Sequence, residues 1–193
     1  MLRKKRLRTM RRYRAQFLSM ILLVALGVGI FFAFQMEWYS IQRDTDQFFD
    51  ETGYADYRIV SQTGFDEAAR DRVAALQGVT KVSRFVSVNA DVTDRDGDSV
   101  ALTVTEDADV SGFLVTDGAA YDAARTDGIW LSQRYAAAND FAVGDKISLA
   151  FQNFTIDTKV LGLIRAGEYL ICVRDETQLM PDYDTYGYAY LSP

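Results

Sequence analysis

The sequence contains no histidine. Its absence removes the side chain that most often serves as a general base, as a zinc ligand or as the partner of a catalytic nucleophile. The single cysteine, Cys172, cannot form a disulfide within the chain, and its apolar neighbours at 170–173 predict a core position. A phosphate-binding loop is also missing, because Gly144-Asp145-Lys146 lacks the upstream glycine spacing and the Ser or Thr that would follow the lysine. Any ATP hydrolysis coupled to this protein must therefore take place on another chain.

Acidic side chains are numerous, but no pair of carboxylates is set apart by its spacing. Three aspartates within residues 94–98 surround Gly97 and resemble a calcium loop. An EF-hand needs Gly at its sixth position and Glu at its twelfth, and these positions hold Ser99 and Thr105 here. We interpret the stretch as a hairpin tip, because Asp-Gly between alternating runs is a strong hairpin signal. We accordingly expect no catalytic, cofactor-binding or metal-binding residue and no enzymatic activity.

Positive and negative charges are separated along the chain. Residues 1–14 hold eight Lys and Arg and no acid, whereas the remaining 13 basic residues face all 27 acidic ones, a net charge of −14. Next to the basic arm, residues 17–34 form an 18-residue run with a single polar side chain, Ser19. As a helix this run would be about 27 Å long, close to the roughly 30 Å of a hydrocarbon core. We therefore predict a transmembrane helix over residues 17–36, preceded by a basic amphipathic arm over residues 1–16.

The same region predicts how the chain crosses the membrane. A signal peptide has a shorter apolar run that ends at small residues, whereas this run ends in Phe-Phe-Ala-Phe at 31–34. Basic residues beside a span stay in the cytoplasm. We therefore expect a plasma-membrane protein with its N-terminus inside and the residues after about 37 outside, with Trp38 and Tyr39 at the interface. Because the span ties the basic arm to the bilayer, we expect the arm to attract anionic lipid and not nucleic acid.

Two patterns around the span predict contacts. Small residues recur every four positions at Ala25, Gly29 and Ala33, a stripe that lets another transmembrane helix approach closely. Chance is the alternative explanation, since small residues are common in spans. Apolar residues in the arm recur at helical spacing: Leu7, Met10, Tyr13 and Phe17. This spacing favours an amphipathic helix on the inner leaflet, and solvated disorder is the alternative.

Helical periodicity continues after the span. Trp38, Ile41 and Phe49 recur at helical spacing with charged residues between them, and Gly53 would end the helix. We predict a stalk helix over residues 37–54 that continues the span, since no Gly-, Ser- or Pro-rich linker interrupts it. A stiff continuation would couple movement outside the membrane to movement within it.

The remaining residues, 55–193, form one domain of ordinary size. Short alternating or apolar segments predict strands, and two segments with helical spacing predict helices. Because strands, hairpins and helices intermix, the expected class is α+β. The expected strands cover residues 57–61, 79–93, 100–104, 128–131, 146–151, 154–164, 169–173 and 186–191, and the expected helices cover residues 65–76, capped by Asp66, and 132–138, capped by Ser132.

Tyrosines cluster near the end of the sequence, where Tyr186, Tyr188 and Tyr190 would project to one face of a strand. Exposed aromatic faces bind sugars or lipids, although such a stripe is more often a half-buried strand face. We favour the structural interpretation and keep this aromatic face as a candidate binding surface.

The order of several segments gives the chain a family resemblance. Residues 128–133 (GIWLSQ), 143–147 (VGDKI) and 158–164 (TKVLGLI) follow the order hydrophobic strand, Ser, helix, hydrophobic-Gly-Asp, alternating strand, Val-x-Gly. Together with the basic arm, span and stalk, this order resembles the FtsX-like permeases of ABC transporters, and the outside part resembles their MacB-type periplasmic core domain. The segments at 48–65 and 179–193 look like large permeases of this family from Gram-positive bacteria. The resemblance covers nearly the whole chain.

The resemblance implies a function without catalysis in this chain. Gly144 and Asp145 would form a turn into a strand, and Gly162 would permit a close backbone approach. In the family, the outside domain transmits motion or engages lipid, lipoprotein or peptide cargo, while an ABC ATP-binding subunit docks in the cytoplasm. Family members have at least four spans and this sequence has one, so we expect it to be the amino-terminal part of a larger permease. A complete single-pass protein whose outside domain binds a ligand or partner is the alternative.

Overall fold

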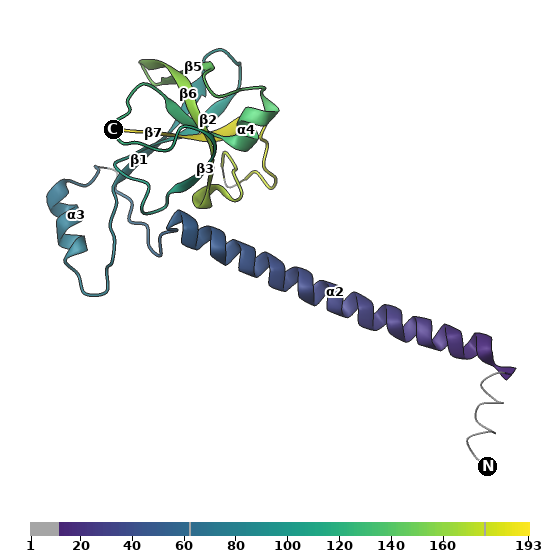
Figure 1. Cartoon of the computed structure of the whole chain (residues 1–193). Coiled ribbons are helices and arrows are strands. Elements are labelled where there is room, and N and C mark those ends of the chain that lie inside the picture. Colours follow the sequence, from purple (N-terminus) through teal and green to yellow (C-terminus); the bar gives the residue numbers. More distant parts are fainter. Residues whose placement is uncertain (1–11, 62, 176) are drawn as a thin grey trace. The chain divides into compact units, whose positions relative to one another are not determined.

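The computed structural model of the chain describes residues 12–61, 63–175 and 177–193, and it divides into two compact units, Met1–Gln47 and Phe48–Pro193. Most of the basic arm predicted at 1–16 lies outside the described residues. Figure 1 shows a long helix, α2, and a strand-rich body with short helices. The mixture of strands and helices agrees with the predicted α+β class.

The helix α2 covers Arg14–Thr52, 39 residues without a proline. At 1.5 Å per residue it is about 58 Å long, nearly twice the thickness of a bilayer's hydrocarbon core. Within the described part of the chain, it is the one helix long and apolar enough to cross a membrane. The helix continues without a break through the segment predicted as a stalk and ends beside Gly53.

A glycine-based cap ends α2. Gly53 takes a positive φ of 59°, which favours glycine. Its N–H bonds the Asp50 carbonyl at 3.3 Å, and the Tyr54 N–H reaches back to the Phe49 carbonyl at 3.0 Å. These two bonds form a Schellman motif, and the stacked rings of Phe49 and Tyr54, 4.4 Å apart, supply its usual apolar contact.

Seven strands form one mixed sheet in the second unit. Their order is β3-β6-β4-β7-β2-β1-β5, and a further pairing between β5 and β6 gives the sheet the closed form of a barrel (Figure 1). The closure depends on β6, which is 13 residues long and pairs with β3, β4 and β5. The strands are β1 Phe85–Val92, β2 Ser99–Thr105, β3 Phe113–Gly118, β4 Ile129–Ser132, β5 Lys146–Phe151, β6 Phe154–Ala166 and β7 Tyr186–Leu191.

Three short helices accompany the sheet: α3 at Glu67–Ala74, α4 at Gln133–Ala138 and the 3-10 turn η1 at Gly167–Tyr169. Asp66 caps α3 as predicted, since its carboxylate accepts from the Ala69 N–H at 2.7 Å. No residue of α3 is buried. Instead, ion pairs connect α3 and the segment after it to the sheet. Glu106, directly after β2, pairs with both Arg70 of α3 and Arg84.

The central strands are buried on both faces. Along β4, Ile129 and Leu131 belong to one core cluster, whereas Trp130 between them belongs to another, and all three are at most 1% exposed. Burial on both faces explains why this segment reads as a short apolar run without alternation. Cys172 lies in the second cluster, as predicted, and burial raises the pKa of its thiol to about 11.

Two expected strands are absent. Residues 57–61 form no strand, and their apolar side chains stay largely in solvent, with Val60 81% exposed. Residues 169–173 begin in η1 and continue without regular structure. In both stretches β-forming residues find no neighbouring strand, so tertiary context overrides their preference.

Three further expectations need correction. The strand β3 at Phe113–Gly118 was not predicted, because its second half is polar and only its first residues pack inward. The strand expected at 79–93 begins only at Phe85. Ser132 precedes α4 but does not cap it with its side chain, since its buried hydroxyl has no hydrogen-bond partner.

Candidate functional site

The stripe of small residues lies on the first half of α2. Residues four apart share a helix face, so Ala25, Gly29 and Ala33 follow one another along one side. A Cβ built on Gly29 would meet no atom within 4 Å. The surface offers space for another helix, and packing against one stays a prediction from the sequence.

The last turn of α2 belongs to the second unit and is hydrogen-bonded into it. The Ser111 N–H donates to the Gly53 carbonyl at 2.8 Å, and the Gly112 N–H donates to the Thr52 carbonyl at 2.8 Å. These bonds satisfy carbonyls that a helix end leaves without partners. We call Thr52, Gly53, Ser111, Gly112 and Gly167 the clasp.

The clasp depends on glycines at close contacts. A Cβ on Gly112 would lie 1.9 Å from the Ala108 carbonyl oxygen, and a Cβ on Gly53 would lie 2.4 Å from the Asp109 carbonyl oxygen. A Cβ on Gly167 would lie 2.9 Å from the Thr52 hydroxyl oxygen. Three segments distant in the sequence therefore approach one another more closely than side chains would allow.

Burial and a cation reinforce the clasp. Thr52 is 2% exposed, and its hydroxyl donates to the Phe48 carbonyl one turn earlier at 2.8 Å. The guanidinium of Arg165, from β6, lies 5.5 Å from the centre of the Phe48 ring, within cation–π range. The end of the helix is thus held by the loop at 106–112 between β2 and β3, by η1 and by β6.

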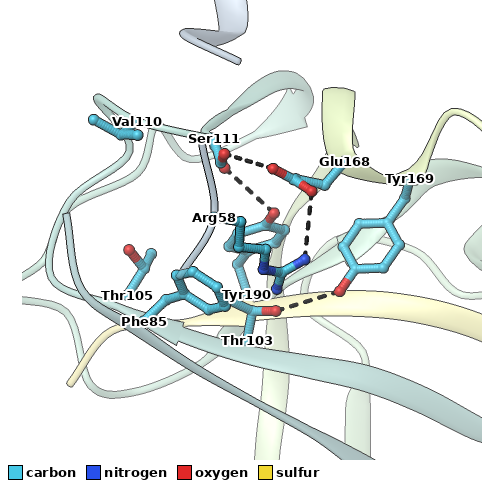
Figure 2. A pocket seen from close by; sticks show the side chains of 9 residues that line it. All are labelled: Arg58, Phe85, Thr103, Thr105, Val110, Ser111, Glu168, Tyr169 and Tyr190. Atoms are coloured by element: carbon cyan, nitrogen blue, oxygen red, sulfur yellow. Dashed lines mark hydrogen bonds and ion pairs between the residues drawn. The ribbon is translucent and has the colours of Figure 1, made fainter. Parts of the chain in front are cut away.

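A pocket adjoins the clasp and shares Ser111 with it (Figure 2). The Ser111 hydroxyl donates to Glu168 at 2.6 Å, and the Arg58 guanidinium donates to the other oxygen of that carboxylate at 3.5 Å. The same guanidinium lies 4.4 Å from the centre of the Phe85 ring. Ser111 takes a positive φ of 49°, uncommon for a residue with a side chain. Strained residues of this kind concentrate at functional sites.

Hydroxyl groups line the rest of this pocket. The hydroxyls of Thr103 and Tyr169 are 3.5 Å apart, and the Tyr190 hydroxyl donates to the Ser111 carbonyl at 3.5 Å. Burial raises the pKa of Tyr190 above its usual range. The Tyr190 hydroxyl therefore stays protonated and neutral at physiological pH.

The turn positions expected from the resemblance are structural. Gly144 takes a positive φ of 99°, and its N–H donates to the Val160 carbonyl at 2.8 Å. The Asp145 carboxylate accepts from the Ala142 N–H at 2.8 Å and so closes the turn before β5. At Gly162, a Cβ would lie 3.0 Å from the Asp117 carbonyl oxygen and 3.1 Å from the Ala119 carbonyl oxygen. The close approach expected at Gly162 is therefore present.

The tyrosines of β7 lie in the core. Tyr186, Tyr188 and Tyr190 are between 3% and 5% exposed and belong to one core cluster. They form the buried face of a strand, and their rings are not on the surface to bind a sugar or lipid. Of these three tyrosines, only Tyr190 lines the pocket beside the clasp.

The acidic hairpin tip also has a structural role. Asp98 is 8% exposed and accepts a hydrogen bond from the Tyr135 hydroxyl at 2.8 Å. Gly97 provides the positive φ, 85°, that turns the chain from β1 into β2. Within the described residues, no group of three or more His, Cys, Asp or Glu side chains is arranged to hold a metal ion.

Sequence patterns did not identify the clasp or the pocket. Their members lie on separate segments, and the sequence singled out two of them for other reasons, Gly53 as the end of a helix and Tyr190 as part of a strand face. For the rest, the one local signal is the Ser111-Gly112 pair, a common turn dipeptide. Comparison with protein-family models gives no match, and no curated protein matches the chain significantly.

Proposed function

We propose that this chain is the amino-terminal part of the permease subunit of an ABC transporter of the FtsX and MacB type. In this role, α2 is the first span, and residues 55–193 form an extracellular MacB-like core domain. The N-terminus lies in the cytoplasm, because the basic arm precedes the span. A partner subunit supplies ATP hydrolysis, which drives export of lipid, lipoprotein or peptide, or the transmission of force across the membrane.

One observation carries the proposal: the apolar helix runs unbroken to a last turn that is bonded into the sheet unit. Transmission of motion needs a stiff connection, since a flexible linker would absorb a displacement of a few ångströms. Here the connection is helical to Thr52, and the clasp then holds two of the last backbone groups. A simple membrane anchor for a binding domain has no need of such a connection.

Co-purification tests the central claim. The gene should be expressed with a tag at its native locus, and the protein extracted from membranes in mild detergent after brief cross-linking. We expect mass spectrometry to find an ABC ATP-binding subunit in stoichiometric yield. Repeated recovery without an ATPase, and with the protein in a single-pass form, would favour the alternative of an anchored ligand-binding protein.

Labelling tests the orientation independently. In a Cys172→Ser background, Asp94→Cys places a thiol at the exposed hairpin tip before β2. A membrane-impermeant maleimide should label this variant in intact cells. Labelling only after lysis would place the sheet unit in the cytoplasm and refute the proposed arrangement.

A further inference from the structure

The pocket beside the clasp already holds a basic side chain of the protein itself. Arg58 comes from residues 55–61, which form no helix or strand, and its neighbours Tyr57 and Val60 are 90% and 81% exposed. Figure 2 shows the Arg58 side chain among those that line the pocket, between the Phe85 ring and the Glu168 carboxylate. Arg58 thus lines the pocket from a segment with little other attachment.

The groups around Arg58 are those that recognise a guanidinium. An aromatic face and a carboxylate together bind arginine by cation–π attraction and by charge-assisted hydrogen bonds. Phe85 supplies the face at 4.4 Å and Glu168 the carboxylate at 3.5 Å. The hydroxyls of Thr103 and Tyr169 lie beside them as further acceptors for a ligand with several N–H groups.

Glu168 makes a short hydrogen bond with Ser111 but only a long ion pair with Arg58. The Ser111 hydroxyl holds Glu168 at 2.6 Å, but the ion pair between Arg58 and Glu168 is 3.5 Å long. Strong pairs of this kind measure about 2.7–2.9 Å. The Arg58 side chain is also 45% exposed, against 18% for Glu168. A long ion pair whose cation is largely exposed contributes little stability, so another ligand can replace Arg58 at small cost.

We propose that this pocket binds the arginine side chain of an extended basic peptide, and that Arg58 is a built-in competitor that such a peptide displaces. Charge supports this class of ligand, since residues 48–193 hold 12 basic and 24 acidic side chains, a net charge of −12. An acidic surface attracts basic peptides and raises their rate of encounter. The inference concerns the second unit alone and does not depend on the proposed transporter function.

The chain's own segment provides the probe. The full chain is placed in phosphatidylcholine nanodiscs, and the labelled, blocked hexapeptide DYRIVS, the sequence of residues 56–61, is titrated by fluorescence polarisation. Arg58→Ala removes the competing side chain, so this variant should bind the peptide about fivefold more tightly than the wild type. The factor corresponds to the free energy of the ion pair between Arg58 and Glu168 that the peptide no longer has to break. The same peptide with citrulline in place of arginine carries an uncharged side chain of nearly the same shape at that position. It should bind Arg58→Ala at least about tenfold more weakly than the arginine peptide.

Two charge changes separate a pocket from general attraction. In the Arg58→Ala background, Glu168→Gln should abolish binding of the arginine peptide. Asp94→Asn removes the same charge at an exposed hairpin tip and should leave binding unchanged. Equal affinity of wild type and Arg58→Ala, equal binding of the two peptides, or equal effects of Glu168→Gln and Asp94→Asn would each overturn the proposal.

A conservative variant guards against loss of structure. If circular dichroism shows that Glu168→Gln unfolds the sheet unit, Phe85→Leu takes its place, because Phe85 is 37% exposed and Leu keeps most of its volume. Without the aromatic face, the arginine peptide should lose its advantage over the citrulline peptide. An unchanged preference for arginine would exclude Phe85, and with it this pocket, as the binding site.

Discussion

Opening the clasp is the most direct test of how the last turn of α2 is held. Gly112→Ala adds a Cβ that would lie 1.9 Å from the Ala108 carbonyl oxygen, whereas real contacts of this kind stay above 3.0 Å. The loop must therefore move by about 1.1 Å, the difference between these distances. A displacement of this size breaks the bonds from Ser111 to Gly53 and from Gly112 to Thr52, each 2.8 Å long.

The expected cost follows from these two contributions. Overpacking of a tight site costs about 1–3 kcal/mol, and each lost backbone bond costs roughly 0.5–1.5 kcal/mol. Because the loop movement relieves part of the collision, we expect the sheet unit to lose about 2–4 kcal/mol of its free energy of unfolding. For a unit of this size, that loss lowers Tm by roughly 5–15 °C.

Two measurements and one control decide the outcome. Thermal unfolding followed by near-ultraviolet circular dichroism gives Tm, and hydrogen exchange gives the protection of the amides of Ser111 and Gly112. Gly78→Ala is the control, because Gly78 also takes a positive φ, 92°, but a Cβ there meets no atom within 4 Å. It should cost about 1 kcal/mol and leave both amides protected. Full protection of the two amides in Gly112→Ala would refute the clasp as described.

Three further predictions concern the span and the core. Gly29→Leu should weaken cross-linking of α2 to neighbouring spans while leaving membrane insertion unchanged, and unaltered assembly would contradict a packing role for the stripe. Tyr135→Phe removes the hydroxyl that bonds Asp98 at 2.8 Å and should lower the free energy of unfolding by about 1–3 kcal/mol in urea; the effect should vanish in an Asp98→Ala background. Burial raises the pKa of Tyr121 and Tyr186 from 10.0 to about 12. These tyrosines lose their protons more readily in the unfolded state, so the free energy of unfolding should be unaffected by them below pH 10 and should fall as the pH rises towards 12. A urea midpoint that stays constant between pH 10 and pH 12 would contradict this prediction.

The sequence predicted the elements whose pattern reflects a local physical requirement. The strands at 146–151 and 186–191 appear with the predicted bounds, because each has a clear strand pattern between turn residues. The hairpin at Gly97 was predicted by an Asp-Gly turn, and the end of α2 was predicted by Gly53. In each case the residues that determine the structure lie next to one another in the chain.

Elements that depend on distant partners were not predictable in the same way. Residues 57–61 contain good strand formers but no neighbour to pair with, whereas β3 has a polar second half and still pairs with β6. In the clasp, Gly53 leaves room for the Asp109 carbonyl and Gly167 for the Thr52 hydroxyl, a significance that appears only when the fold brings these segments together. A sequence pattern identifies a glycine that bends its own segment, but not one that leaves room for another segment.

The clasp and the arginine pocket should be energetically coupled, because they share neighbouring residues. Gly167 makes room for Thr52, and the adjacent Glu168 binds both Arg58 and Ser111. A ligand that binds Glu168 therefore changes the contacts of a residue that bonds Ser111 and adjoins Gly167, both members of the clasp. Coupling between two sites is reciprocal. In the Arg58→Ala background, Gly112→Ala should weaken binding of the hexapeptide, and saturating peptide should slow exchange at the Gly112 amide in the parent variant. Peptide affinity unchanged by Gly112→Ala, together with exchange unchanged by the peptide, would show that the two features are independent.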